Sequence, residues 1–325
     1  MKYTKNSITI QVRVYSFGEA NGRNMLEIKT VKNEKSENFG KEFIAGTIQV
    51  AVDEAGLNVI PVHYTFVSPT TKTGGTNNTF TALKALIDGG KTWVKDGKDA
   101  APMVKLEPSF ALNDFYINEN GEDKLVSQVM HEGGFATIVN TLPENEAERT
   151  HFRCDMVITN VTRIDADEEK NIDEHVAIRG AVFNFRKELL PHTFTVKNPN
   201  GMNYFEGLGV SGSEPVYTWV EGVINCNTVK SEVKEETAFG GDSVRTYERK
   251  TKEWLVVRAS QNPYDFGEEG VLTVDELKKA MGDREVALAE NRKRSLDFKN
   301  NANTTTATPA ATTTAAPAKE AKFQF

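Results

Sequence analysis

The chain has 325 residues and a net charge of −7, with 38% hydrophobic and 26% charged residues. Its length suits two domains of about 100–150 residues, and no uncharged apolar run reaches the roughly 18–20 residues of a membrane helix, which predicts a soluble protein with no membrane partner. The negative charge does not exclude a nucleic acid, because a strand-binding protein needs only a basic groove on an otherwise acidic surface.

The start of the chain and its two cysteines indicate a cytoplasmic protein. Met1–Ser7 leads into alternating polar and apolar residues, without the apolar stretch of a secretory signal. Cys154 and Cys226 are too few for a disulfide framework and lack CxxC spacing. Both are therefore predicted to be buried thiols.

Alternation with period 2 marks the first strands. Residues 8–14, 25–31 and 44–52 alternate between apolar and polar side chains, which is typical of antiparallel strands with one buried face. Asn58–Val67 is a further apolar run, in which Pro61 favours a sheet edge or a bulge.

A short amphipathic helix is predicted over residues 79–93, with Thr79 as a candidate N-cap and Gly89-Gly90 as its end. The strand pattern then resumes in four segments, residues 103–106, 110–117, 125–130 and 135–139.

The second half repeats the order of the first. Ile178-Arg179-Gly180 repeats Ile44-Ala45-Gly46 within a strand, and Pro191 in the following strand matches Pro61. The strand with Pro191 is residues 189–196, and the remaining predicted strands of this half are residues 151–164, 215–226 and 245–259. Residues 204–208 stand in the place of the helix.

The order strand, strand, strand, helix, strand, strand is that of an OB-fold, a five-stranded Greek-key barrel with its helix between the third and fourth strands. The sequence therefore predicts a mainly β protein of two OB-like Greek-key barrels in tandem. Another β-sandwich or barrel remains open, because these signals occur in many sandwiches. The predicted units are residues 1–148 and residues 149–299, and the second includes a C-terminal helix.

That helix begins at a capping box formed by Thr273 and Glu276 and continues to about residue 298. From residue 300 the composition is mostly Thr, Ala, Asn and Pro, which cannot bury enough apolar surface to fold. Residues 300–325 are predicted to be a disordered tail that ends in a partner-binding aromatic peptide with Phe323 and Phe325.

Enzyme motifs are absent from the sequence. It contains no GxGxxG, GxxxxGK[ST], HExxH or GxSxG, and its five histidines lack ligand spacing. We therefore predict no enzyme, no cofactor and no metal. Residues 165–169 are predicted to be a solvated acidic turn, and His131–Gly134 a β-turn.

Three segments combine aromatic and basic residues in strand and loop positions, the pattern that stacks bases and contacts phosphates. The opposing interpretation is that strand aromatics are core residues, and it weighs most on Phe183, Phe185 and Trp254. The candidate nucleic-acid-binding residues are Arg13, Tyr15, Phe17 and Arg23; Arg179, Phe183, Phe185, Arg186 and Lys187; and Arg245, Tyr247, Arg249, Lys250 and Lys252.

The element order, the repeated Ile-x-Gly-x-[Val/Ile] strand and the low-complexity tail ending in Phe325 together resemble single-stranded DNA-binding proteins, in particular those encoded by bacteriophages. The resemblance covers most of residues 1–300 and the tail. It implies OB-folds that bind strands in a basic, aromatic-lined groove, a tail that recruits replication and recombination proteins, and a host-cell cytoplasmic location if the protein is phage-encoded. The resemblance does not decide whether the protein forms a homo-oligomer.

The tail departs from that family. The family's tail tip is acidic, whereas this one has Lys319 and Lys322 against Glu320. An identical partner surface is therefore in doubt, and the tail could instead cap the protein's own groove or a neighbouring subunit.

The predicted function is sequence-independent binding of single-stranded DNA in replication or recombination. The alternative is a β-sandwich protein-interaction module, phage structural or host-inhibitory, without nucleic-acid binding, which the acidic charge permits equally well.

Overall fold

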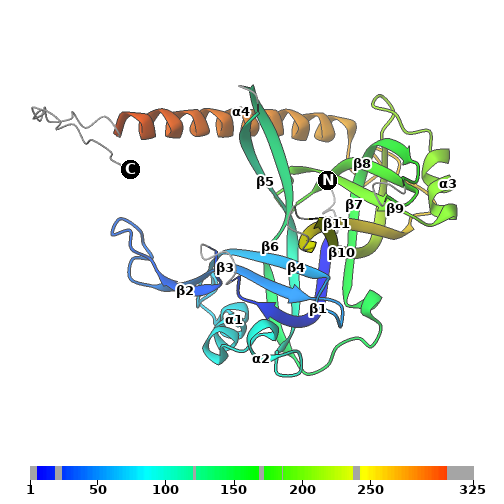
Figure 1. The fold of residues 1–325 in the computed structure, drawn as a ribbon. Helices are drawn as coiled ribbons and strands as arrows, with labels where there is room; N and C mark the ends of the chain where they lie inside the picture. The colour runs from blue at the N-terminus through cyan, green and yellow to red at the C-terminus, as the bar shows by residue number, and fades with distance from the viewer. Residues whose placement is uncertain are drawn as a thin grey trace, which may run out of the picture.

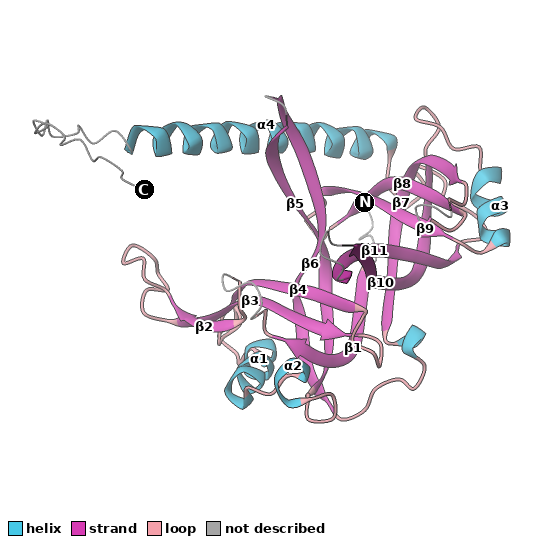
Figure 2. Cartoon of the chain, viewed as in Figure 1, coloured by secondary structure: helices cyan, strands magenta, loops and turns pink. Residues whose placement is uncertain are grey.

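The computed structural model describes residues 6–18, 24–119, 122–167, 172–184, 186–236 and 242–305, without the side chains of residues 227–236, 242–250 and 298–305. Strands dominate this part of the chain, with a long helix at its C-terminal end (Figure 2). The predictions of a mainly β protein and of a C-terminal helix are confirmed.

Five strands of the N-terminal half close into a circuit that we call the first ring. Its strands are β1 (Ser7–Ser16), β3 (Glu42–Ala51), β4 (Val59–Val67), β5 (Met103–Glu119) and β6 (Glu122–Val139). β1 pairs with β3, β3 with β4, β6 with β5 and β5 with β1, all antiparallel, whereas β4 and β6 pair in parallel. The helices α1 (Asn78–Gly89) and α2 (Trp93–Asp96) connect β4 to β5, and β2 (Glu27–Thr30) pairs with the start of β3.

The second ring repeats this circuit with the same order. Its strands are β7 (Thr150–Ile164), β8 (His175–Phe183), β9 (Leu189–Val196), β10 (Val216–Glu236) and β11 (Asp242–Ala259). β7 pairs with β8 and β10, β8 with β9, and β10 with β11, all antiparallel, and β9 pairs with β11 in parallel. The helix α3 (Pro199–Gly207) connects β9 to β10, and η2 (Glu146–Glu148) precedes β7.

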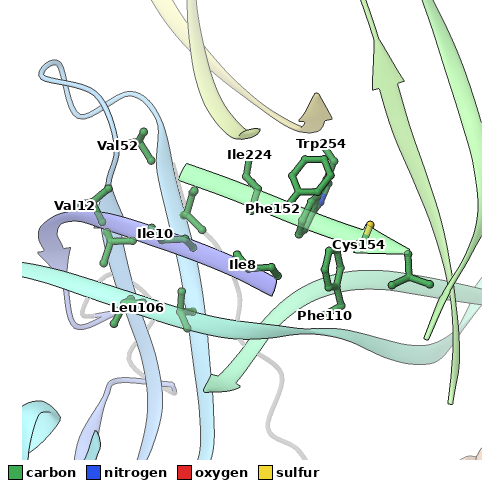
Figure 3. Packing of buried hydrophobic residues seen from close by; sticks show 14 of the residues in the cluster. Ile8, Ile10, Val12, Val52, Leu106, Phe110, Phe152, Cys154, Ile224 and Trp254 are labelled. Carbon is green, nitrogen blue, oxygen red and sulfur yellow. The ribbon is translucent and has the colours of Figure 1, made fainter. Parts of the chain in front are cut away.

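The two rings are joined through their first strands. Ser7–Ile10 of β1 pairs antiparallel with Thr150–Arg153 of β7, so that the described strands form one eleven-stranded sheet (Figure 1). One hydrophobic core runs through both rings: Phe110 of the first ring lies beside Phe152 and Trp254 of the second (Figure 3). The predicted boundary between residues 148 and 149 lies in the connection between the rings and stays a prediction.

The repeated glycine marks a close approach of two backbones. A Cβ atom on Gly46 would lie 1.9 Å from the carbonyl oxygen of Met25, and one on Gly180 would lie 2.0 Å from that of Val157. No side chain fits at either position. Each glycine therefore lets another backbone approach the second strand of its ring, Met25 before β2 in the first ring and Val157 of β7 in the second.

The long β5–β6 hairpin bends where a bulge interrupts its pairing. The predicted β-turn at His131–Gly134 is wrong, because these residues lie inside β6, opposite a register shift between Glu107 and Ser109. Gly133 and Gly134 have φ angles of 61° and 78°, a left-handed conformation that is typical of bulges.

The helix α4 (Val274–Thr305) begins at the predicted capping box: the backbone N–H of Glu276 donates to Thr273 Oγ1, and the backbone N–H of Thr273 donates to Glu276 Oε2. It ends seven residues beyond the predicted end at about residue 298, so residues 300–305, which were predicted to belong to the tail, lie in the helix. No helix in the described ranges has an apolar stretch long enough to span a bilayer. The predicted partner peptide with Phe323 and Phe325 lies outside the described residues.

Candidate nucleic-acid interface

Two phenylalanines stack on the outside of the first ring. The rings of Phe43 and Phe66 have centroids 4.6 Å apart and planes inclined by 23°, and Phe66 is 48% exposed. β3 places Phe43 near its start, and β4 places Phe66 near its end. Large aromatic side chains are usually buried, so this pair, in which Phe66 is exposed and Phe43 half-buried, is available to contact a planar ligand.

Lysines flank this pair. Lys29 of β2 lies opposite Phe43 in the β2–β3 pairing, and its Nζ lies 3.2 Å from Glu27. Lys41 directly precedes β3, and its Nζ donates to Asn38 Oδ1 at 3.2 Å. Surface pairs of this kind contribute little to stability, so both ammonium groups can turn towards a phosphate at little cost.

A groove of about 880 Å³ runs from Phe66 to the turn between β8 and β9, and α4 forms its far wall. We call it the inter-ring groove. Its charged lining residues are four cations and four carboxylates, namely Arg186, Lys187, Lys279, Arg284, Asp114, Glu132, Glu188 and Asp283. The lining is thus neutral as a whole.

The wall made by α4 is fixed to the β5–β6 hairpin, which it crosses (Figure 1). Arg284 Nη2 lies 3.1 Å from Asp114 Oδ1, with both side chains 15% exposed. Asn291 Nδ2 donates to the carbonyl oxygen of Asp114 at 2.9 Å, and the Tyr116 hydroxyl donates to that of Leu288 at 3.3 Å. The groove is therefore held open between α4 and the first ring.

Among the predicted residues, the turn between β8 and β9 brings Arg186 and Lys187 into the groove lining. Asn184 Oδ1 accepts hydrogen bonds from the backbone N–H groups of Arg186 and Glu188. Lys187 has a φ of 65°, the one positive value among the described residues other than glycine, and this conformation is uncommon for lysine. Arg179 is exposed on β8 and does not line the groove.

Two predicted stacking residues are wrong. Phe17 and Phe183 are 5% and 1% exposed and belong to the core, because the inward positions of the strands and their ends take large apolar side chains. Tyr15 is half-buried against Trp93, with ring centroids 6.0 Å apart. Arg13 Nη1 donates to the carbonyl oxygen of Ala101 at 3.2 Å, which ties it to the chain just before β5.

The remaining predicted residues are placed only in part. Lys252 keeps an exposed stem, and its Nζ donates to the carbonyl oxygen of Val129, which joins β11 to β6. Burial lowers the pKa of this ammonium group. Residues outside the described part are Arg23 and Phe185, together with the side chains of Arg245, Tyr247, Arg249 and Lys250.

Next to Lys252, two histidines are buried where the rings meet. The His131 ring stacks on Trp254 at 5.2 Å, and the His192 ring meets Trp254 edge-on at 4.8 Å. Desolvation by burial, followed by the charge of Lys252, lowers the pKa of both histidines to about 3. Both rings are neutral at pH 7 and form part of the core.

The sequence reasoning missed Phe43 and Phe66. Phe66 interrupts the alternation of β4, because Thr65 and Phe66 are both exposed between the buried Tyr64 and Val67. Two consecutive outward residues indicate a bulge, and this signal was available in the YTFV segment only once the strand boundaries were known. Within the described ranges, no group of three or more His, Cys, Asp or Glu side chains is placed to hold a metal ion.

A sequence model of the YorF family matches residues 5–294 of the chain. No curated protein matches it. Two solved structures are similar at 10% sequence identity: a deletion mutant and the wild-type form of the single-stranded DNA binding protein from Thermus aquaticus, with TM-scores of 0.39 and 0.38. Each match covers 82% of this chain and 98% of the other.

Proposed function

This chain belongs to the YorF family, and we propose that it binds single-stranded DNA without sequence preference, through rings that are OB-like barrels. In both rings the first strand pairs with the second and the fourth, and the third pairs in parallel with the fifth. A helix lies between the third and fourth strands, as in an OB-fold. OB-folds bind oligonucleotides on the face of their second and third strands.

The Phe43–Phe66 pair carries this proposal. In the first ring the second and third strands are β3 and β4, and the exposed stack lies on these two strands. Base stacking on aromatic side chains contributes about 1–3 kcal/mol per base and tolerates any sequence. Lys29 and Lys41 supply nearby charge for the phosphates.

The test is a titration of a labelled oligonucleotide of about 12 nucleotides, within the roughly 4–16 that one OB-fold covers, followed by anisotropy at two salt concentrations. We expect salt-sensitive binding that is selective for the single strand over its duplex. Phe66→Ala should weaken binding about 5- to 150-fold, which corresponds to one lost stacking contact of about 1–3 kcal/mol.

Val94→Ala is the matched control, because Val94 is 56% exposed on α2 and is not part of β3 or β4. It should bind like the wild type. Absence of binding at low salt would contradict the proposed function and leave the protein-interaction alternative.

The proposal also covers the biological role and the tail. We propose that the protein acts in DNA replication or recombination by binding and not by catalysis, and that residues 306–325 recruit a partner through Phe323 and Phe325. Pull-down of replication proteins by the full chain and by a Phe323→Ala/Phe325→Ala variant tests this role. Equal recovery by both proteins would remove the tail from it.

A further inference from the structure

We infer that the second ring carries its own contact for the same single strand, on a surface that we call the Trp219 patch. It consists of His151 and Arg153 of β7, Trp219 and Glu221 of β10, and Arg258 of β11. This inference rests on the proposed function and adds a second binding surface to it.

The patch places a planar aromatic side chain beside cations. The guanidinium carbon of Arg153 lies 4.3 Å from the centroid of the half-buried Trp219 ring. A base can stack on the guanidinium plane of Arg153 or on the part of the Trp219 ring that it leaves uncovered, while an arginine N–H group reaches a phosphate.

One carboxylate is shared by three basic side chains. Glu221 lies 3.2 Å from His151 Nε2, 3.7 Å from Arg153 Nη1 and 3.7 Å from Arg258 Nη1. Glu221 is only 17% exposed, whereas the side chains of Arg153 and Arg258 are 43% and 73% exposed. The two positive charges of the arginines therefore outnumber the one negative charge of Glu221, and both arginines face solvent, where a phosphate can reach them.

A second carboxylate nearby has its own partner. Asp155 lies opposite Trp219 in the β7–β10 pairing, and its Oδ1 accepts a hydrogen bond from the Tyr264 hydroxyl at 3.3 Å. The negative charge of Asp155 lowers the positive potential around Trp219. We therefore expect the patch to bind single-stranded DNA weakly alone, and to add affinity for a strand that the first ring already holds.

The sheet connects the two surfaces. β3 pairs with β1, β1 with β7 and β7 with β10, and Thr9 of β1 lies opposite His151. The Phe43–Phe66 pair and the Trp219 patch therefore lie on the outside of one continuous sheet. Two contacts on one rigid frame bind a strand long enough to reach both more tightly than a short strand, because the second contact is intramolecular.

The test compares thymidine oligonucleotides of about 10 and about 30 nucleotides, one within and one beyond the reach of a single OB-fold. The wild type should bind the long strand at least about tenfold more tightly than the short one. Arg258→Ala and Trp219→Ala should remove most of this gain and leave short-strand binding unchanged. Arg258→Ala should also reduce the salt slope for the long strand by about 0.7, the value for one phosphate contact on a single strand.

For Glu221→Gln we expect the opposite effect on binding of the long strand. It keeps the shape of the side chain and removes the charge that neutralises the arginines, so binding of the long strand should become several-fold tighter. Lys84→Ala on α1 is the control for loss of one positive charge and should leave the length dependence unchanged.

The outcomes separate the two proposals. A wild type that binds neither strand contradicts the proposed function and this inference together. A wild type that binds, with a length dependence that neither Arg258→Ala nor Glu221→Gln alters, overturns the Trp219 patch alone. Arg258 is mostly exposed and glutamine is isosteric with glutamate, so neither result depends on whether Trp219→Ala folds.

Discussion

Burial at the junction of the rings keeps two histidines uncharged, which makes the stability of the folded state depend on pH. His131 Nδ1 contacts the carbonyl oxygen of Pro61, but Nε2 of His131, Nε2 of His192 and Nε1 of Trp254 have no hydrogen-bond partner in the described part of the chain. The groups that face these histidines include Lys252, which would repel an imidazolium. A proton added to either ring would therefore be buried without a counter-charge.

The first prediction concerns stability at mildly acidic pH. The pKa of each histidine falls from 6.5 to about 3 on folding, so the unfolded chain binds more protons between these values and the folded state loses stability as pH falls below 6.5. At pH 5 the loss is about 2 kcal/mol per histidine relative to pH 8. Urea unfolding at both pH values measures it.

His192→Phe should reduce this pH dependence, because phenylalanine retains the aromatic contacts and does not titrate. Val94→Ala, on the surface of α2, should keep the wild-type dependence. An equal loss in wild type and His192→Phe would show that His192 does not contribute to the acid sensitivity.

Among the elements, α4 is held in position by contacts that the local sequence does not predict. The capping box at Thr273 and Glu276 was predictable, because capping acts within four residues. The pairing of Arg284 with Asp114 joins residues 170 positions apart, and no local pattern indicates it. The same distinction explains why alternation predicted the strands of each half, whereas the circuits that close the rings depend on distant partners.

A second prediction follows from the Arg284–Asp114 contact. Arg284→Ala would leave the mostly buried Asp114 carboxylate without its charged partner and weaken the docking of α4 by about 2 kcal/mol. We expect amide hydrogens at residues 277–291 to exchange about 30-fold faster, while those of the rings remain protected.

Hydrogen exchange measured by mass spectrometry checks this outcome. Arg292→Ala provides the comparison, because Arg292 is exposed and its guanidinium carbon lies 5.8 Å from the centroid of the Tyr116 ring, an exposed cation–π contact of about 0.5–1 kcal/mol. Its loss should therefore change exchange much less than Arg284→Ala. Similar exchange in wild type and Arg284→Ala would mean that other contacts hold the helix.

At the scale of the whole molecule, the two rings share one core. The repeat of Ile44-Ala45-Gly46 in Ile178-Arg179-Gly180 predicted two similar halves, and both halves have the same strand pairing. The sequence did not predict that Phe110 and His131 of the first ring pack on Trp254 of the second, because period-2 patterns state which residues are buried and not against what.

The third prediction is that the rings unfold together. Separation would expose the aromatic junction to water, so neither ring keeps its core alone. Urea unfolding of a Trp93→Phe variant, in which fluorescence reports on the second ring, should have the same midpoint as the circular dichroism of the whole chain. Two separated transitions would contradict this prediction and favour independent units at residues 1–148 and 149–299.

The shared pairing of β1 also has a consequence for how the chain is made. Synthesis proceeds from the N-terminus, so every strand of the first ring has left the ribosome before Thr150–Arg153, the partner of Ser7–Ile10, is available. Until then the nascent chain presents an unpaired strand edge next to an apolar surface, the kind of edge to which a neighbouring nascent chain can add. Slow emergence of residues 139–150 from the ribosome would prolong this exposure, and fast emergence would shorten it.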